Sequence, residues 1–117
     1  MKLDEAVSFY NEILTGKNTG EYPDDDKIRL YYDIGLTYVY KKDPDNAVKF
    51  FERCLSLNPE EEIWLLPHSY YELGKILDKK GNKKKSEEMF EMIFTYNDYD
   101  FQSFLEMRLA NYLYNKL

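Results

Sequence analysis

Apolar residues recur at intervals of three and four along nearly the whole chain, and no segment alternates apolar and polar residues with a period of two. This spacing is typical of α-helices that bury one face, whereas a half-buried strand needs a period of two. We therefore predict an all-α fold of about six helices and no β-sheet. The expected helices cover residues 3–15, 24–41, 44–57, a stretch from about 60 to 80, 83–95 and 100–116.

Proline and acidic residues mark where two of these helices begin. Residues 22–26 read Tyr-Pro-Asp-Asp-Asp, and Asp43 directly precedes Pro44. Proline is tolerated in the first turn of a helix, and carboxylates there oppose the positive end of the helix dipole. Both patterns therefore predict a helix start.

The fourth helix has a less regular beginning. Residues 58–61 read Asn-Pro-Glu-Glu and resemble a capping box, which predicts a helix start there. Pro67 follows one to two turns later and interrupts helical hydrogen bonding. We therefore expect a short first piece around Trp64, followed by a kink or by a new helix that runs to Lys80.

The chain contains an internal repeat of eight places, in the order aromatic, large aliphatic, glycine, tyrosine, alanine, phenylalanine, small and proline. The first copy consists of Tyr31, Ile34, Gly35, Tyr38, Ala47, Phe51, Cys54 and Pro59. The second copy consists of Tyr70, Leu73, Gly74, Leu77, Ser86, Phe90, Ile93 and Asp98, of which Leu77, Ser86, Ile93 and Asp98 depart from the pattern. An earlier half copy consists of Ala6, Tyr10 and Ile13. Short helical pairs at a fixed period predict a stacked array rather than a closed bundle.

This order of residues resembles the tetratricopeptide repeat over nearly the whole chain. The resemblance implies a single domain, an α-solenoid fragment whose antiparallel helix pairs form a right-handed superhelix. Its parts would be the second helix of a partial repeat at 1–16, full repeats at 24–59 and 60–98, and a closing helix at 99–117. The copies are spaced by more than the family's 34 residues, which places insertions between repeats at 21–27 and 62–66.

The last helix fits the repeat in two ways. Leu109 and Ala110 match the aliphatic and glycine places of a third copy, but Leu113 stands where that copy would have tyrosine. The helix is therefore either the first helix of a third repeat or a capping helix.

Two glycines carry a physical prediction of their own. Gly35 and Gly74 lie inside predicted helices, where glycine is about 1 kcal/mol less favourable than alanine. A second helix that crosses close to each glycine would offset this cost, with Ala47 or Ser86 as the matching small residue. The spaces between neighbouring pairs would then be filled by Tyr38, Phe51 and Phe90.

Composition limits the class of protein. The chain has 117 residues, enough for one domain, and 44% of them are hydrophobic, which argues against disorder. Its single cysteine, Cys54, excludes an intramolecular disulfide and is expected to be buried and inert. No apolar run approaches the roughly 18 residues of a membrane span, and residues 1–5 lack the charge pattern of a signal peptide. We therefore expect a cytoplasmic protein.

The sequence contains no residue set for catalysis, for a metal or for a cofactor. His68 is the single histidine, so neither a histidine-rich metal site nor a histidine pair can form. No glycine-rich phosphate loop, nucleophile elbow or paired-carboxylate motif occurs. Residues 24–26 and 60–62 are acidic but lack the alternating ligands and the glycine of a calcium loop. We therefore expect a protein that is not an enzyme.

Charge is distributed unevenly between the loops. Acids cluster between repeats, at Glu21, Asp24, Asp25, Asp26, Glu60, Glu61 and Glu62. Lysines cluster within repeats, at Lys41, Lys42, Lys79, Lys80, Lys83, Lys84 and Lys85. In a stack of antiparallel pairs these loops lie on opposite edges, so we expect one acidic and one basic edge. Lys83, Lys84 and Lys85 begin a helix, where cations are unfavourable, and are either an anion contact or a solvated run.

The family resemblance implies that the first helix of each pair lines a concave groove that binds a peptide or a helix of a partner protein. The candidate groove residues are Arg29, Tyr32, Asp33, Leu36, Tyr40, His68, Tyr71, Glu72, Lys75 and Lys79. Tyr32 and Tyr71 would supply much contact area for little lost entropy, or else be partly buried against a neighbouring helix. Some relatives bind carboxylates with a Lys/Asn clamp, but the matching places here hold Tyr32, Leu36 and Glu72.

The sequence also allows two other functions, self-association and nucleic-acid binding. The chain begins on the second helix of a pair, which leaves a face for self-association and suggests a piece of a longer array. That face comprises Leu3, Val7, Tyr10 and Leu14. Nucleic acid could instead bind along the lysine edge, but a net charge of -6 disfavours this.

Overall fold

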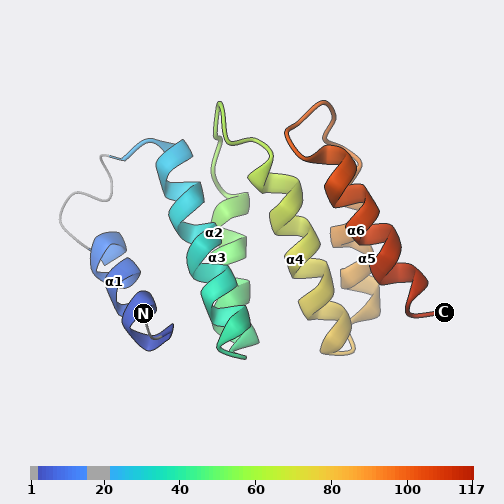
Figure 1. The fold of residues 1–117 in the computed structure, drawn as a ribbon, viewed down its shortest axis with the longest axis horizontal. Coiled ribbons are helices and arrows are strands. Elements are labelled where there is room, and N and C mark those ends of the chain that lie inside the picture. The colour runs from blue at the N-terminus through green and yellow to red at the C-terminus, as the bar shows by residue number, and fades with distance from the viewer. Residues whose placement is uncertain (1–2, 16–21) are drawn as a thin grey trace.

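The computed structural model describes residues 3–15 and 22–117, and that part of the chain forms six α-helices and no strand. In chain order the helices are α1 (Leu3–Thr15), α2 (Asp24–Tyr40), α3 (Pro44–Leu55), α4 (Leu65–Lys79), α5 (Lys83–Ile93) and α6 (Gln102–Tyr114). The helix pairs follow one another along the long axis of a molecule of 46 × 31 × 24 Å, with α1 at one end and α6 at the other (Figure 1). The predicted all-α fold is confirmed.

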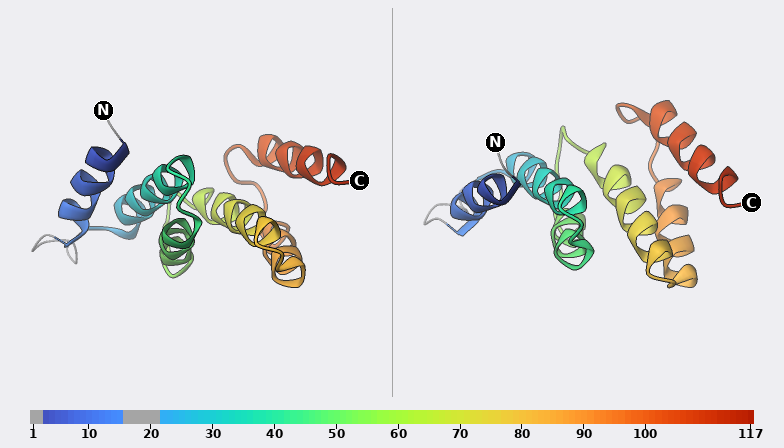
Figure 2. Two further views of the ribbon diagram at one scale, coloured as in Figure 1. Left: turned by 90° about the horizontal axis from the view of Figure 1, so that it is seen from below. Right: turned by 60° about the horizontal axis from the view of Figure 1, so that its bottom comes forward.

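The helices form antiparallel pairs in two layers. Figure 1 shows that α2 pairs with α3 and α4 with α5. In Figure 2, α3 and α5 form one layer, and α1, α2, α4 and α6 form a curved row with α1 and α6 raised at its ends. The hollow side of this row, which we call the concave face, is turned away from α3 and α5.

Helix ends follow the predicted signals with small differences. The side chain of Asp43 accepts a hydrogen bond from the backbone N–H of Asn46 at 3.3 Å, which confirms the start of α3 at Pro44. The helices α2, α3, α5 and α6 end one or two residues earlier than expected. α6 also starts late, at Gln102, because Phe101 has a left-handed φ of 65°.

The predicted capping box at residues 58–61 is wrong. No helix begins there, and α4 starts at Leu65 with Pro67 in its first turn, where proline is tolerated. The carboxylate of Asp25 on α2 instead accepts hydrogen bonds from the backbone N–H groups of Glu60, Glu61 and Glu62 at 3.4, 3.1 and 2.8 Å. These hydrogen bonds, that from Glu62 above all, hold the pKa of Asp25 below its usual value against the opposing effect of burial. A long-range contact thus supplies the acceptor that the side chain of Asn58 would have supplied in a capping box.

The two glycines allow the close approach that was predicted for them. A Cβ atom on Gly35 would lie 2.7 Å from the Phe51 ring, and one on Gly74 would lie 2.3 Å from the Phe90 ring. Ser86 sits beside the second crossing, and its hydroxyl donates to the carbonyl of Gly74 at 2.7 Å. The second helix of each pair therefore crosses the first at its glycine.

The expectation that phenylalanines fill the space between pairs needs correction. Phe51 and Phe90 lie against the glycine of their own pair, and Tyr38 stacks on Phe50, also within one pair, with ring centroids 5.7 Å apart. Phe90 additionally meets Tyr112 of α6 at 5.9 Å.

Cys54 is fully buried, as predicted. Its Sγ atom lies 3.8 Å from the backbone carbonyl of Ile28, to which the thiol donates. Burial raises the pKa of Cys54 to about 12, so the reactive thiolate is not formed at neutral pH.

A buried carboxylate joins the last three helices. Asp78 on α4 accepts a hydrogen bond from the Tyr112 hydroxyl at 2.6 Å and pairs with Lys83 at 3.0 Å and with Lys116. Hydrogen bonds from Lys116 and Tyr112 are the main cause that holds the pKa of Asp78 well below its usual range. α6 also contributes Leu105 and Leu109 to the core.

Replacing Asp78 with asparagine is expected to lower the free energy of unfolding at pH 7 by about 2 kcal/mol, because buried hydrogen bonds to charged groups are weakened. Since the folded-state pKa of Asp78 is depressed, this stabilisation is present above about pH 4 and is lost as the pH falls below it. Urea unfolding measures the loss. The control is Asp45→Asn, whose carboxylate is 80% exposed and pairs with Lys80, and it should leave the stability unchanged. Equal losses in both variants would contradict a special role for Asp78.

Candidate functional site

The two tyrosines predicted to line the groove are buried. Tyr32 is 9% exposed and packs edge-on against Phe51, and Tyr71 is 4% exposed and packs against Phe90. Burial raises the pKa of both phenols. The tyrosines hold equivalent positions, but the alternative of burial against a neighbouring helix describes them better than a contact surface does.

Two further groove candidates on α4 are also buried. His68 is 4% exposed, packs edge-on against Trp64 at 5.1 Å, and its Nε2 atom has no hydrogen-bond partner in the described residues. Burial, with a smaller contribution from the positive charge of Arg108, lowers the pKa of His68 to about 4. Glu72 is 4% exposed and pairs with Lys75 at 3.0 Å. Neither residue offers a free surface to a partner.

The remaining candidates on α2 lie closer to solvent. Arg29 is exposed and pairs with Glu62 at 3.0 Å, and with Asp33 it lines a hollow of about 340 Å³. Leu36 is half-buried, whereas Tyr40 is 73% exposed at the other end of the helix. The structure therefore divides the predicted groove residues into a buried set and an exposed set.

A second hollow of about 340 Å³ lies between α4 and α6. Because no residue of α5 lines it, this α4–α6 hollow opens on the concave face. It brings Tyr71, Lys75 and Lys79 of the predicted groove together with residues that were not predicted. Its full lining is Tyr71, Lys75, Lys79, Arg108, Asn111, Tyr112, Asn115 and Lys116.

The lining of this hollow is cationic and contains no carboxylate among the described residues. The ring of Tyr71 forms part of its wall, with Lys75 Nζ 4.6 Å and the Arg108 guanidinium 4.8 Å from the ring centroid. Lys79 and Arg108 form no salt bridge within the described residues. Their charges are therefore available to an anionic group.

The α6 half of this hollow was missed from the sequence. The third-copy alignment through Leu109 and Ala110 would have placed Arg108 and Asn111 at the positions of Glu72 and Lys75. Because the sequence fits a capping helix equally well, the repeat did not assign Arg108 and Asn111 to the groove.

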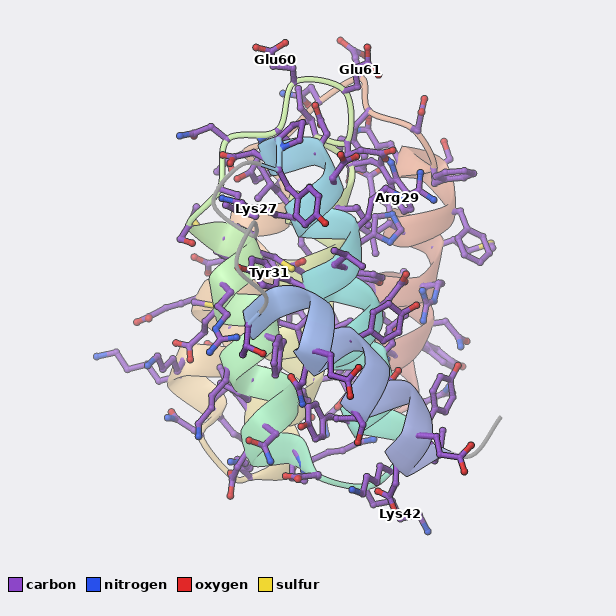
Figure 3. The ribbon with its side chains drawn as sticks, turned by 90° about the vertical axis from the view of Figure 1, so that its left-hand side faces the viewer. Lys27, Arg29, Tyr31, Lys42, Glu60 and Glu61 are labelled. Atoms are coloured by element: carbon purple, nitrogen blue, oxygen red, sulfur yellow. The ribbon has the colours of Figure 1, made fainter. Side chains whose placement is uncertain are left out.

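The loops separate acidic residues from lysines only in part. Figure 3 shows Glu60 and Glu61 at one edge of the molecule and Lys42 at the other. The lysine edge also carries acids, since Lys41 pairs with Asp4 and Lys80 with Asp45. Glu21 lies outside the described residues.

The lysine run at the start of α5 is only partly free. Lys83 pairs with Asp78 at 3.0 Å, whereas Lys84 and Lys85 are exposed. The structure brings no second feature to this run that points to an anion, so its role as an anion contact stays a prediction.

The predicted self-association face on α1 is largely covered by the chain itself. Val7 is 6% exposed, and Tyr10 is half-buried against the same core. α1 packs on α2, which accounts for this burial. Leu3 is 42% exposed, and Leu14 lies outside the residues whose side chains are described. The expectation of an open apolar face through Val7 and Tyr10 is therefore wrong.

Two general findings limit the chemistry of the described residues. Residues 3–15 and 22–117 hold no group of three His, Cys, Asp or Glu side chains placed to bind a metal ion. No helix in the same ranges has the length and apolar character that crossing a membrane requires.

Comparison with known proteins identifies the repeat. The family model described as tetratricopeptide repeat matches residues 28–61 and 67–97, which is more than half of the chain. These ranges cover most of α2 and α4 and all of α3 and α5, the helices of the two pairs that cross at Gly35 and Gly74. No curated protein and no solved structure matches the chain with significant similarity.

Proposed function

Because the chain belongs to the tetratricopeptide repeat family, whose repeats are typically non-catalytic protein-interaction modules, we propose that it binds an acidic segment of a partner protein in the α4–α6 hollow. The observation that carries this proposal is the cationic lining of that hollow in a chain whose net charge is -6.

Each part of the lining has a role in this proposal. Arg108 and Lys79 attract the carboxylates of the segment, and a guanidinium can bind a carboxylate through two parallel hydrogen bonds. Asn111 and Asn115 offer both donors and acceptors to the backbone of the segment. Tyr71 fixes the position of the two cations nearest to it, since both lie within 5 Å of its ring centroid.

The concave face of α2 extends this surface. Leu36 and Tyr40 hold the positions in α2 that Lys75 and Lys79 hold in α4. We assign them apolar contacts with the partner, and Tyr40 has the exposure for this role. Arg29 lies toward the other end of α2 and would contact an acidic residue farther along the segment. The short groove predicts modest affinity that falls with salt, because exposed charges are screened.

Neutralising two cations of the hollow, in the double variant Lys79→Gln/Arg108→Gln, is expected to weaken binding of an acidic peptide at least about tenfold, since each of the two lost charge contacts removes about 1 kcal/mol. The probe is a fluorescein-labelled peptide in which Asp and Glu alternate with Leu and Tyr, and fluorescence anisotropy measures its Kd.

The control for this experiment is Lys84→Gln/Lys85→Gln, which changes the net charge equally on α5, outside the hollow. It should alter the Kd less than about twofold. A peptide that binds both double variants equally well, or that prefers the α5 lysines, would contradict the proposed site. Circular dichroism establishes that each variant retains its helices.

A further inference from the structure

A second groove lies on the other side of α6, between α5 and α6. Its volume is about 600 Å³, and its lining is Glu87, Phe90, Glu91, Phe94, Glu106, Leu109, Ala110 and Leu113. Phe94 and Leu113 are 59% and 45% exposed although both are large and apolar. An apolar groove of this kind marks a surface that binds another molecule more often than a scattered exposed side chain does.

The internal repeat identifies what kind of element fits this α5–α6 groove. In each complete pair, the second helix crosses the first at Gly35 or Gly74. Ala110 of α6 holds the equivalent position, one residue after Leu109, which is buried like its counterparts. Ala110 is exposed and lines the groove, so no helix of the described residues crosses α6 there.

The groove also has the dimensions of a short helical contact. Its lining extends from Glu87 of α5 to Phe94, the C-cap of that helix, and from Glu106 to Leu113 of α6, which is eight residues on each side. At 1.5 Å per residue this is about 12 Å, or roughly two turns of a crossing helix. The methyl group of Ala110 excludes an aromatic ring as close as the rings on the two glycines, so an aliphatic side chain fits there.

The rim of the α5–α6 groove is acidic and therefore favours an occupant with basic residues. Glu87, Glu91 and Glu106 surround the apolar floor, and none of them forms a salt bridge within the described residues. An occupant with acidic flanks would be repelled, whereas lysine or arginine on either side of an apolar stripe would pair with these carboxylates.

We propose that the α5–α6 groove binds a basic amphipathic helix of a partner protein. The apolar stripe of that helix packs on Phe94, Ala110 and Leu113, and its basic residues face the three glutamates. This surface differs from the α4–α6 hollow in charge and in position, so the two are occupied independently and by segments of opposite charge.

A second copy of this chain is a poor occupant. Of the helices in a second copy, α1 is the one expected to fit this groove, because it matches the second helix of a repeat whose first helix is absent. Its exposed face includes Asp4, Glu5 and Glu12. Head-to-tail stacking would place these acids against the glutamates of the groove. Like charges in an interface disfavour association.

Peptide binding tests the proposal. The probe is a labelled helical peptide of Leu and Lys of about 14 residues, roughly four turns, and the comparison peptide carries Glu in place of Lys. Fluorescence anisotropy should detect binding of the lysine peptide in the α5–α6 groove. The glutamate peptide should bind only in the cationic α4–α6 hollow, so Lys79→Gln/Arg108→Gln should weaken it and Glu87→Lys/Glu91→Lys should not. Glu87→Lys/Glu91→Lys is expected to weaken the lysine peptide at least about tenfold. The charge-matched control, Glu60→Lys/Glu61→Lys on the α3–α4 loop, should change its Kd less than about twofold.

An apolar pair of variants completes the test. Phe94→Asp should weaken the lysine peptide at least about tenfold, and Met107→Asp, at a residue that is 62% exposed outside the groove, should not. Neither should alter binding of the acidic peptide to the α4–α6 hollow, which separates this proposal from the proposed function. Equal effects of the groove and control variants would overturn it. So would a dimer in sedimentation equilibrium that Phe94→Asp dissociates, because a second copy would then fill the groove.

Discussion

Replacing Gly74 with valine is expected to lower the free energy of unfolding by about 3 kcal/mol, because overfilling a packed core is destabilising. A Cβ atom at this position would lie 2.3 Å from the Phe90 ring, well inside contact distance. The ring cannot easily retreat, because Tyr71 and Tyr112 pack on it. The better helix propensity of valine offsets only a few tenths of a kcal/mol. Urea unfolding followed by circular dichroism gives the difference.

The repeat supplies a matched control for this variant. Ala110 holds the same position in α6, where no helix crosses, so Ala110→Val should change stability by less than about 0.5 kcal/mol. The double variant Gly74→Val/Phe90→Leu should recover part of the loss, because the smaller side chain makes room. If valine at Gly74 and valine at Ala110 had the same effect, the crossing at the glycine would not be what holds the pair together.

The free energy of unfolding is expected to fall by about 3 kcal/mol as the pH drops from about 7 to about 4, because the unfolded state binds a proton at His68 more readily than the folded state does. Burial lowers the pKa of His68 to about 4 in the folded protein, whereas the unfolded chain binds the proton near the ordinary value of 6.5. The unfolded state therefore takes up the proton first, so this contribution to stability is complete above the unfolded pKa and is lost between the two values.

The single histidine makes this prediction directly measurable. One imidazole signal is present for NMR, and its chemical shift should stay constant down to about pH 5 in the folded protein. The reference variant His68→Leu replaces the imidazole with an apolar side chain that cannot titrate, and it should lack the portion of the pH dependence between pH 6.5 and 4. An imidazole that titrates near 6.5 in the folded protein would show that His68 is not buried as described.

The sequence was sufficient for the helix pairs because the two glycines are a local signal with a packing consequence. Glycine inside a helix is unfavourable alone, so Gly35 and Gly74 predict a close crossing from the sequence. The crossing partners Ala47 and Ser86 followed from the same repeat, and both are buried. The placement of Glu60 and Glu61 opposite Lys42 (Figure 3) was also predicted, because antiparallel pairing assigns successive loops to opposite edges. The predicted basic edge is mixed, since Asp4 and Asp45 pair with its lysines.

The start of α4 could not be read from local sequence. Residues 58–61 have the residue types of a capping box, but Asp25 takes up the backbone donors of the loop from more than thirty residues away. Capping rules consider neighbours in sequence, and here the competing acceptor is a neighbour in space. The same limitation applies to the Asp78 network, whose Tyr112 and Lys116 partners belong to the last helix and its C-terminal end.

The predicted groove was partly wrong for a related reason. Tyr32 and Tyr71 occupy positions that turn toward the concave face, but each ring also reaches the phenylalanine of the second helix, and burial against it is more favourable than exposure. The cationic groups of Lys75 and Arg108, which lie over the Tyr71 ring, are on the concave face instead of the ring itself. The position in the repeat identified the correct helix but not how deeply its side chains are buried.

The most direct test of the proposed function is an NMR titration of the ¹⁵N-labelled protein with the acidic peptide. The account predicts that amide signals of Lys75, Lys79, Arg108 and Asn111 shift in proportion to occupancy, while those of Lys84, Lys85 and the α5–α6 groove stay in place. Shifts confined to the lysines at the start of α5, or no shifts at peptide concentrations in the millimolar range, would contradict it.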